Sequence, residues 1–337
     1  MYNRKDPQVL PVRDGVGPSC VVLPSQGTGT LLDFLAARLP LVPRSDWQRR
    51  MQAGEVVDEW GVPATAERPF VPGLRLYYYR SLPSEPAIPF EESVIYQDEH
   101  LLVADKPHFL PVVPTGAYLH HTLLVRLKRR LGLPELSPVH RIDRDTAGLV
   151  LFSTQRATRG AYQALFRDRT VRKVYEANAP WRPDITFPRE HVSRMEESPQ
   201  FFRMHEVPGE PNTRTHMEVL EQAGGWARYR LAPVTGKRHQ LRVHMAALGL
   251  PLWGDAFYPE VNDPPPGDYS RPLQLLARRL EFVDPVTGEE RCFDSQRQLL
   301  ALSELAPRRV RSLDDQKTGE ARHLQDAGAG EGNRTLV

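Results

Sequence analysis

The pattern of apolar and polar positions predicts a small N-terminal unit of helices and short strands. Four apolar residues fall on one face of a first helix: Leu31, Phe34, Leu35 and Leu39. A second helix follows, with Trp47 and Met51 on one face, Ser45 as its N-cap and Gly54 at its end. Short strands and turns are expected after it. Residues 1–27 show no periodicity and are expected to form a flexible arm.

A longer pattern over residues 91–300 predicts a second, larger unit, which the proline-rich linker 81–90 separates from the first. This unit begins with a hairpin that turns between Asp98 and His100. An unbroken apolar run at residues 148–153 has the length and composition of a buried strand. The last residues, 312–337, carry no pattern that could form a core, so we expect them to be disordered.

Composition narrows the class of protein. The 337 residues include two cysteines, Cys20 and Cys292, which lie far apart and outside any C-x-x-C spacing. This argues against a disulfide scaffold, a zinc ribbon and a thiol redox site, and it favours a reducing compartment. No apolar stretch is long enough to cross a bilayer, so we expect a cytoplasmic protein without a membrane partner. The net charge of only +2 means that any basic surface must be local.

The stretch VHRIDRDTAGLVLF places five ionisable side chains within six positions and then enters the expected buried strand. These side chains are His140, Arg141, Asp143, Arg144 and Asp145. Pro138 before them and Gly148 after them confine the charges to a loop. A loop at the end of a buried strand can hold catalytic groups on a rigid base, although a solvated turn with incidental ion pairs fits this segment equally well.

A second charged stretch, VTGKRHQLRVHMAALGLPLWGD, predicts a helix with a basic start that ends at Gly249. Its apolar side has helical spacing through Leu241, His244, Met245 and Leu248. The basic residues are Lys237, Arg238, His239 and Arg242. Arg238 and Arg242 are four positions apart and would share a face. A solvated basic face is the alternative, but the two stretches together favour an acid held near arginines and facing an anionic substrate.

Several segments resemble the RluA family of pseudouridine synthases. HRIDRDTAGLVLFS is similar to the H-R-L/I-D-x-x-T-S/A-G-L signature, and TGKRHQLRVHMAALGLPLWGD to the T-G-R/K-x-H-Q-I/L-R-x-H segment. QDEHLLVADKP resembles the D-x-x-L-L-V-x-D-K-P segment, RKVYEANAP the K-x-Y-x-A strand, and LLARRLEFVDPVTGE the closing strand. These segments follow the family's order over roughly residues 90–295.

The resemblance implies a mixed α+β catalytic domain with a large antiparallel sheet and a central cleft. It implies isomerisation of uridine to pseudouridine in structured RNA, without a cofactor or a metal. Asp143 corresponds to the nucleophile, Arg242 to its charged partner and Tyr175 to the active-site tyrosine. Whether Asp143 attacks C1′, attacks the ring or removes a ribose proton stays open.

The same resemblance implies base flipping, because a target atom inside stacked RNA is out of reach. Arg141 would fill the gap that the extruded nucleotide leaves. Four further residues are grouped with it as RNA-binding: His140, Lys106, Lys237 and Arg238. For His140, shaping the loop by hydrogen bonding is favoured over chemistry. Lys106 is assigned a structural or a phosphate-contacting role.

A metal site is a weaker interpretation of the same histidines and acids. His140, Asp143 and Asp145 could supply ligands, with His239 or His244 completing the set. Their spacing meets no zinc pattern, and the arginines in the loop would repel a cation. The sequence therefore predicts no metal here.

Residues 28–80 resemble the alpha-L RNA-binding module, known from ribosomal protein S4, that precedes many such synthases. This implies a small α/β unit whose second helix directs Arg44, Arg49 and Arg50 toward phosphates. Such contacts position RNA without specifying its sequence.

Two classes of function stay open. The leading one is an RNA pseudouridine synthase, with ribosomal RNA favoured over transfer RNA as substrate. The alternative is a non-catalytic RNA-binding protein of the same fold. We expect a monomer without an obligate protein partner.

Overall fold

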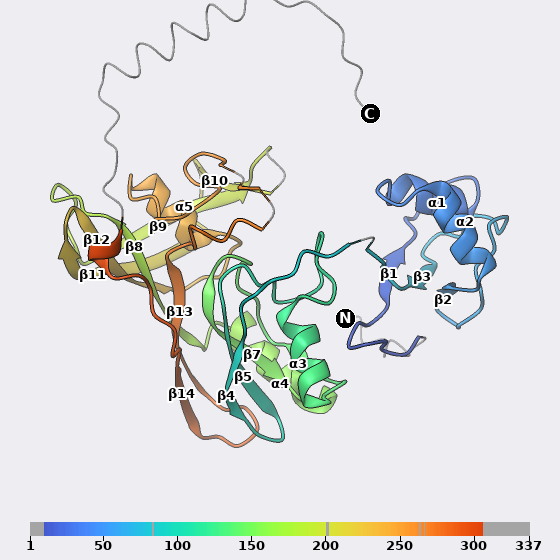
Figure 1. Cartoon of the computed structure of the whole chain (residues 1–337), viewed down its shortest axis with the longest axis horizontal. Coiled ribbons are helices and arrows are strands. Elements are labelled where there is room, and N and C mark those ends of the chain that lie inside the picture. The colour runs from blue at the N-terminus through green and yellow to red at the C-terminus, as the bar shows by residue number, and fades with distance from the viewer. Residues whose placement is uncertain (1–9, 83, 200–201, 263, 266, 306–337) are drawn as a thin grey trace, which may run out of the picture.

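A computed structural model of the protein describes residues 10–82, 84–199, 202–262, 264–265 and 267–305, and Figure 1 shows its arrangement. The predicted disordered tail at 312–337 lies outside these residues. A small N-terminal unit with a three-stranded sheet lies beside a larger unit with an eleven-stranded sheet. No helix within the described part of the chain is long and apolar enough to cross a membrane.

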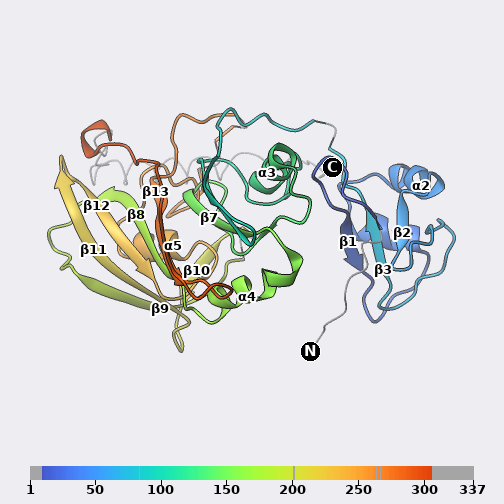
Figure 2. The same ribbon diagram turned by 90° about the horizontal axis from the view of Figure 1, so that it is seen from below.

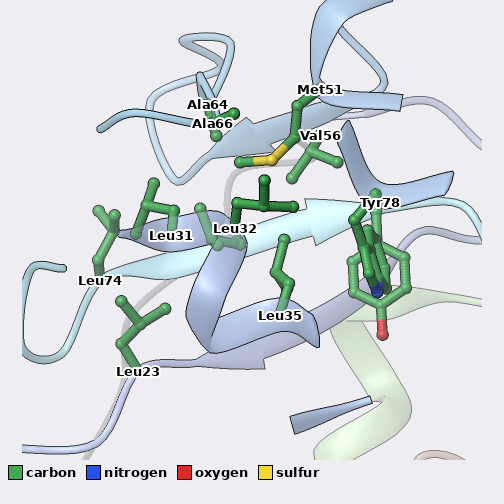
Figure 3. Packing of buried hydrophobic residues seen from close by; sticks show 12 residues of the cluster. Leu23, Leu31, Leu32, Leu35, Met51, Val56, Ala64, Ala66, Leu74 and Tyr78 are labelled. Atoms are coloured by element: carbon green, nitrogen blue, oxygen red, sulfur yellow. The ribbon is translucent and has the colours of Figure 1, made fainter. Parts of the chain in front are cut away.

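The N-terminal unit packs two helices against an antiparallel sheet of order β1-β3-β2. Its elements are β1 (Ser19–Val22), α1 (Leu31–Arg38), α2 (Arg44–Gln52), β2 (Val56–Asp58) and β3 (Arg75–Tyr78). Figure 3 shows leucines from α1 meeting residues of α2 and of the strands in one apolar cluster. The two helices predicted in this region are confirmed.

Three details of this unit differ from the sequence prediction. Strand β1 lies inside the segment 1–27 that was predicted to be a flexible arm, because its backbone pairs with β3. Val16, further toward the N-terminus, is buried against Leu119 and Val125 of the larger unit. The N-cap of α2 is Pro43 and not Ser45, which lies within the first turn.

The linker 81–90 is also anchored. Its Glu85 carboxylate accepts hydrogen bonds from three consecutive backbone N–H groups, those of Leu119, His120 and His121. These bonds hold the pKa of Glu85 below its usual value although burial opposes the charged form. The linker therefore lies against the larger unit.

The large sheet has the order β10-β9-β11-β12-β8-β13-β7-β5-β4, with β14 paired to β13 and β6 paired to β7. Its strands are β4 (Ser93–Gln97), β5 (Leu101–Lys106), β6 (Ser137–Pro138), β7 (Ala147–Ser153), β8 (Arg172–Pro180), β9 (Arg189–Glu197), β10 (Met204–Val207), β11 (Thr213–Ala223), β12 (Trp226–Pro233), β13 (Leu275–Val283) and β14 (Glu290–Asp294). The predicted hairpin at Asp98 is confirmed as β4–β5.

The sheet is mixed and not wholly antiparallel as predicted. All pairs are antiparallel except β7 with β13, which run parallel and join the two halves of the sheet. Gly148 of β7 has φ of 109°, and a Cβ added there would lie 2.3 Å from the carbonyl oxygen of Ala277 in β13. Only glycine lets the two backbones approach so closely, so this residue fixes the junction.

Helices cover the sheet on both faces near this junction. They are α3 (Leu123–Leu131), α4 (Arg156–Arg167) and α5 (Gln240–Ala247), and a short 3-10 helix spans Leu302–Glu304. Val150 and Phe152 of β7 belong to the core that includes α3, whereas Leu149 and Leu151 belong to the core that includes Tyr162 of α4. Strand β7 is therefore buried on both faces, as its apolar run predicts.

Helix α5 packs on the other half of the sheet. Leu241 and Met245 on this helix join a core with residues of β8, β11, β12 and β13. Figure 2 shows α5 on the concave side of these strands. The cleft described below lies between α5 and the loop that precedes β7.

Candidate active site

Three residues that the sequence singled out meet at one cleft of about 800 Å³. Asp143 lies in the loop between β6 and β7, Tyr175 on β8, and Arg242 on α5. These elements are far apart in the sequence and belong to both halves of the sheet. The parallel junction of β7 with β13 brings them together.

Arg242 is fixed by a buried acid. Its Nε donates to Oδ2 of Asp255 at 2.9 Å and its Nη2 to Oδ1 at 2.6 Å. The third nitrogen, Nη1, is left to face Asp143 and lies 3.4 Å from its Oδ2. Burial opposes the charge on Arg242, but the hydrogen bonds and charge of Asp255 outweigh it and raise the arginine pKa. The guanidinium therefore stays charged and aimed at Asp143.

His239 borders the carboxylate on its other side. It is the N-cap of α5 in a left-handed conformation, with Nε2 3.9 Å from Oδ1 of Asp143. Its Nδ1 lies 2.9 Å from the hydroxyl of Tyr258. Burial lowers the pKa of His239, although the charge of Asp143 works against this. A neutral ring at this point leaves Arg242 as the charge that faces the carboxylate.

Tyr175 supplies a phenol to the cleft wall. Burial raises its pKa above the usual range, and the nearby charge of Asp143 adds to the effect. At neutral pH the side chain is therefore protonated and can donate a hydrogen bond or stack on a base. It is a poor candidate for a general base.

Two residues predicted to bind RNA form contacts that stabilise the loop between β6 and β7. Lys106 is fully buried, and its Nζ donates to the carbonyl of Arg144 at 2.8 Å and to that of Pro107 at 2.9 Å. His140 stacks on Phe166, and its Nε2 accepts the backbone N–H of Leu151 at 3.1 Å. The RNA-binding assignment of Lys106 is wrong because its ammonium group is buried and bonded to two carbonyls. His140 is partly exposed and lines the cleft, so its RNA-binding assignment stays a prediction.

Burial also changes the charge of these two residues. It lowers the pKa of Lys106 to about 7, although Asp145 and Asp143 oppose the shift. It lowers the pKa of His140 to about 3, so that its ring is neutral and can act as a hydrogen-bond acceptor. For His140, the loop-shaping role favoured from the sequence is the one that its contacts support.

Arg141, Lys237 and Arg238 line the cleft and are exposed. Helix α5 begins only at Gln240, so Arg238 precedes it and does not share a helical face with Arg242 as predicted. The helix starts late because Gln240 braces the turn before it: its Oε1 accepts from the hydroxyl of Thr235 at 2.7 Å and from the backbone of Lys237 at 3.1 Å.

The three arginines of α2 have different surroundings. Arg50 is buried, and its guanidinium donates to the carbonyl of Tyr79 at 3.2 Å and to the hydroxyl of Ser81. Its predicted phosphate contact is wrong because the group is used inside the protein. Arg44 and Arg49 are exposed and pair with Asp33 at 2.8 Å and Asp46 at 3.5 Å.

Sequence reasoning missed two residues of this site. Asp255 is the last residue of the quoted GLPLWGD segment, so the signal was present without an assigned role. Lys173, in the K-x-Y strand, lines the cleft two residues before Tyr175, and its Nζ donates to the carbonyl of Thr235 at 3.0 Å. Burial lowers the pKa of Lys173 to about 8, and the charge of Arg169 adds to the shift.

Comparison with known proteins identifies the family of the chain. The family model described as RNA pseudouridylate synthase matches residues 100–247, a range that contains Asp143, Tyr175 and Arg242. An uncharacterized RNA pseudouridine synthase of Synechocystis is 32% identical over 232 residues, which cover 68% of this chain and 79% of that protein. A dual-specificity RNA pseudouridine synthase RluA of Haemophilus influenzae is 34% identical over 211 residues, 60% of this chain and 92% of the relative.

A solved structure shares the fold. The human RNA pseudouridylate synthase domain containing 1 superposes with a TM-score of 0.51 at 24% identity and covers 71% of this chain and 98% of that one. The family model begins at residue 100, beyond the N-terminal unit. The resemblance of residues 28–80 to an S4-like module therefore stays a prediction.

Proposed function

The chain belongs to the RluA family of RNA pseudouridine synthases and isomerises uridine to pseudouridine in RNA, and we propose that Asp143, Tyr175 and Arg242 carry this reaction. The observation that carries the proposal is the arrangement around Asp143. Its carboxylate lies in the cleft, 3.4 Å from an arginine that a buried acid holds in place.

The reaction conserves atoms and electrons. The bond from C1′ to N1 of uracil breaks, the base turns, and a bond from C1′ to C5 forms. C5 loses a proton and N1 gains one, so no oxidant, reductant or leaving group is consumed. We propose that no cofactor or metal takes part in these steps.

Asp143 starts the reaction as a carboxylate. Arg242 favours this ionised form by its charge, and Asp255 keeps the arginine from turning away. A carboxylate at this point could attack carbon or remove a ribose proton, and both routes need the same negative charge. Asp255 is thus proposed as a positioning residue, since it acts through Arg242.

Tyr175 would hold the flipped base. As a protonated phenol it offers a ring face for stacking and an O–H for one hydrogen bond. Arg141, exposed at the rim of the cleft, would occupy the space that the base leaves in the RNA. Base flipping is favoured because the cleft is recessed and the carboxylate lies inside it.

The cleft wall carries cations for the phosphates next to the target. We assign this role to Lys237, Arg238 and Lys173. Among the described residues no carboxylate forms an ion pair with Lys173, and only the carbonyl of Thr235 accepts from it. Lys173 is only partly exposed, and an ammonium group that has lost part of its hydration without gaining a counter-ion would be stabilised by an RNA phosphate.

For the substrate we propose ribosomal RNA ahead of transfer RNA. The N-terminal unit, which includes β1 in addition to residues 28–80, lies beside the catalytic unit at 91–300 and would extend the surface available to a large RNA (Figure 1). Arg44 and Arg49 remain its candidate phosphate contacts. The protein is proposed to act in the cytoplasm as a monomer.

The experiment that tests this proposal uses purified protein and transcripts of ribosomal and transfer RNA. Carbodiimide-stop sequencing maps pseudouridine before and after incubation. New pseudouridines at defined ribosomal positions, absent with Asp143→Asn, are expected. RNA retention without any new pseudouridine would instead indicate the non-catalytic binding protein, and new sites confined to transfer RNA would overturn the substrate choice.

A further inference from the structure

Three potential metal ligands converge away from the proposed catalytic residues. They are His191 on β9, Glu206 on β10 and His244 on α5, and one ligand atom from each lies within 4.8 Å of the others. His191 Nε2 is 2.7 Å and His244 Nε2 is 4.0 Å from the same oxygen, Oε1 of Glu206. The two imidazole rings are 4.6 Å apart between centroids.

We propose that His191, Glu206 and His244 form a binding site for a divalent metal ion of the zinc type. Two imidazole nitrogens with one carboxylate oxygen are a donor set that Zn²⁺ favours, whereas Mg²⁺ and Ca²⁺ prefer oxygen ligands throughout. The proposal does not depend on the catalytic roles argued above.

The separations fit one ion after small movements. In a tetrahedral site two metal–ligand bonds of about 2.1 Å place their ligand atoms about 3.4 Å apart. His244 Nε2 and Glu206 Oε1, now 4.0 Å apart, would have to approach each other slightly. His191 and Glu206, now at hydrogen-bond distance, would have to spread when the ion replaces the shared proton.

Groups around the ligands are suited to orient them. Nδ1 of His244 lies 3.0 Å from Oγ1 of Thr215, which also accepts from Nε2 of Gln240 at 3.0 Å. This contact orients the ring so that Nε2 faces Glu206, the arrangement that metal-binding histidines commonly have. The hydroxyls of Ser193 and Thr213 also reach Nε2 of His244 and could bond to a water held by the ion.

The site is closed on one side and open on the other. The His244 side chain is fully buried and that of His191 is 14% exposed, whereas that of Glu206 is 26% exposed. An ion could therefore enter past Glu206 and keep a water as its fourth ligand.

The ion would have a structural role. His244 and Arg242 are two residues apart on α5, which places them roughly 200° apart around the helix axis. Arg242 faces Asp143 in the cleft, whereas His244 contacts Thr213 and Thr215 of β11. An ion at His244 would tie α5 to β9 and β10 and steady the helix that carries Arg242, without touching RNA.

The test uses the full-length protein after removal of metals by EDTA and dialysis. Zinc is added, and both bound zinc per chain and the thermal midpoint are measured, with Mg²⁺ as the comparison. We expect about one zinc per chain, as three protein ligands and a water imply. The midpoint should rise with zinc and stay unchanged with Mg²⁺. Cobalt should bind with the visible absorption of a tetrahedral site.

Variants locate the ion. His191→Gln and Glu206→Gln should each abolish stoichiometric zinc and the rise in midpoint, whereas His216→Gln on the exposed side of β11 should keep both. A stripped wild-type protein that takes up no zinc at micromolar concentration would overturn the proposal without any variant. Zinc bound equally by all of these variants would also overturn it, because the ion would then be bound elsewhere.

Discussion

The cleft around Asp143 and the N-terminal unit both carry arginines that the sequence singled out, but the two regions hold them differently. In the cleft, Arg242 is buried and both oxygens of Asp255 fix two of its nitrogens. In the N-terminal unit, Arg44 and Arg49 pair with acids on the surface, and Arg50 is turned into the core. A buried pair fixes a direction, which chemistry requires, whereas exposed pairs leave a charge free to exchange partners with phosphates.

The largest loss of stability is expected when the buried pair of Arg242 and Asp255 is broken. Asp255→Ala leaves the buried charge of Arg242 with Asp143 as its remaining acidic partner, which costs about 3–5 kcal/mol in the free energy of unfolding. Urea denaturation measures this cost. The matched surface change, Arg49→Ala, should leave the urea midpoint unchanged. If Asp255→Ala were as stable as the wild type, the buried pair would matter no more to stability than the exposed pairs of the N-terminal unit.

A second large effect is expected where the two halves of the sheet join. In Gly148→Ala the new Cβ would collide with the backbone of Ala277, and the φ of 109° disfavours any side chain. We expect a loss of more than about 2 kcal/mol in the free energy of unfolding, from strain and overpacking. Gly54→Ala, where φ is also positive but the space is open, is the control. A smaller loss at Gly148 than at Gly54 would contradict the account of the junction.

A moderate effect on RNA binding is expected at Lys173, the partly buried cation of the cleft. Lys173→Gln should weaken RNA binding and flatten the dependence of log K on log salt by about 0.7, the value of one phosphate contact on a single strand. Lys128→Gln on α3 serves as the control.

The charge of Lys173 also predicts a pH dependence. Because its pKa is about 8, the Lys173 side chain carries a positive charge below that pH. It loses this charge as the pH rises through 8. Wild-type affinity for RNA should therefore fall as the pH rises above 8, and that fall should be smaller in Lys173→Gln. Identical pH profiles for the two proteins would exclude Lys173 as a phosphate contact.

The smallest effect on function is expected from replacing the exposed arginines of the N-terminal unit. Arg44→Ala with Arg49→Ala should flatten the salt dependence by roughly 1.4, if each lost contact contributes about 0.7. The apparent KM should rise, and the single-turnover rate at saturating RNA should not change. Arg50→Ala instead should lower the thermal midpoint of the protein. An unchanged salt slope and KM in the double variant would leave the N-terminal unit without a role in RNA binding.

Elements that depend on the apolar and polar pattern of neighbouring residues could be predicted from the sequence. The apolar run of β7, the hairpin at Asp98 and the helix that ends before Gly249 depend on neighbouring residues. The cleft residues Asp143, Tyr175 and Arg242 were found because their motifs are contiguous. The parallel pairing of β7 with β13 could not be found in this way, because it joins segments far apart in the sequence.

Burial was the property that sequence reasoning missed most often. Lys106 and Arg50 are polar residues whose type suggests exposure, yet each is buried and donates to backbone carbonyls. His140 is partly exposed, but its ring stacks on Phe166 and its Nε2 accepts a backbone N–H. Asp255 was missed for a related reason, since its partner lies 13 positions away across a turn. Such roles depend on tertiary contacts, which spacing alone does not reveal.

The most direct test of the central claim is the single-turnover rate of Asp143→Asn on a short RNA that the wild type modifies, measured together with RNA affinity. The amide is nearly isosteric but cannot supply the negative charge that faces Arg242. We predict no detectable pseudouridine at saturating enzyme, with affinity within a few-fold of wild type. A rate within tenfold of wild type would contradict the assignment of Asp143 and the account of the cleft built around it.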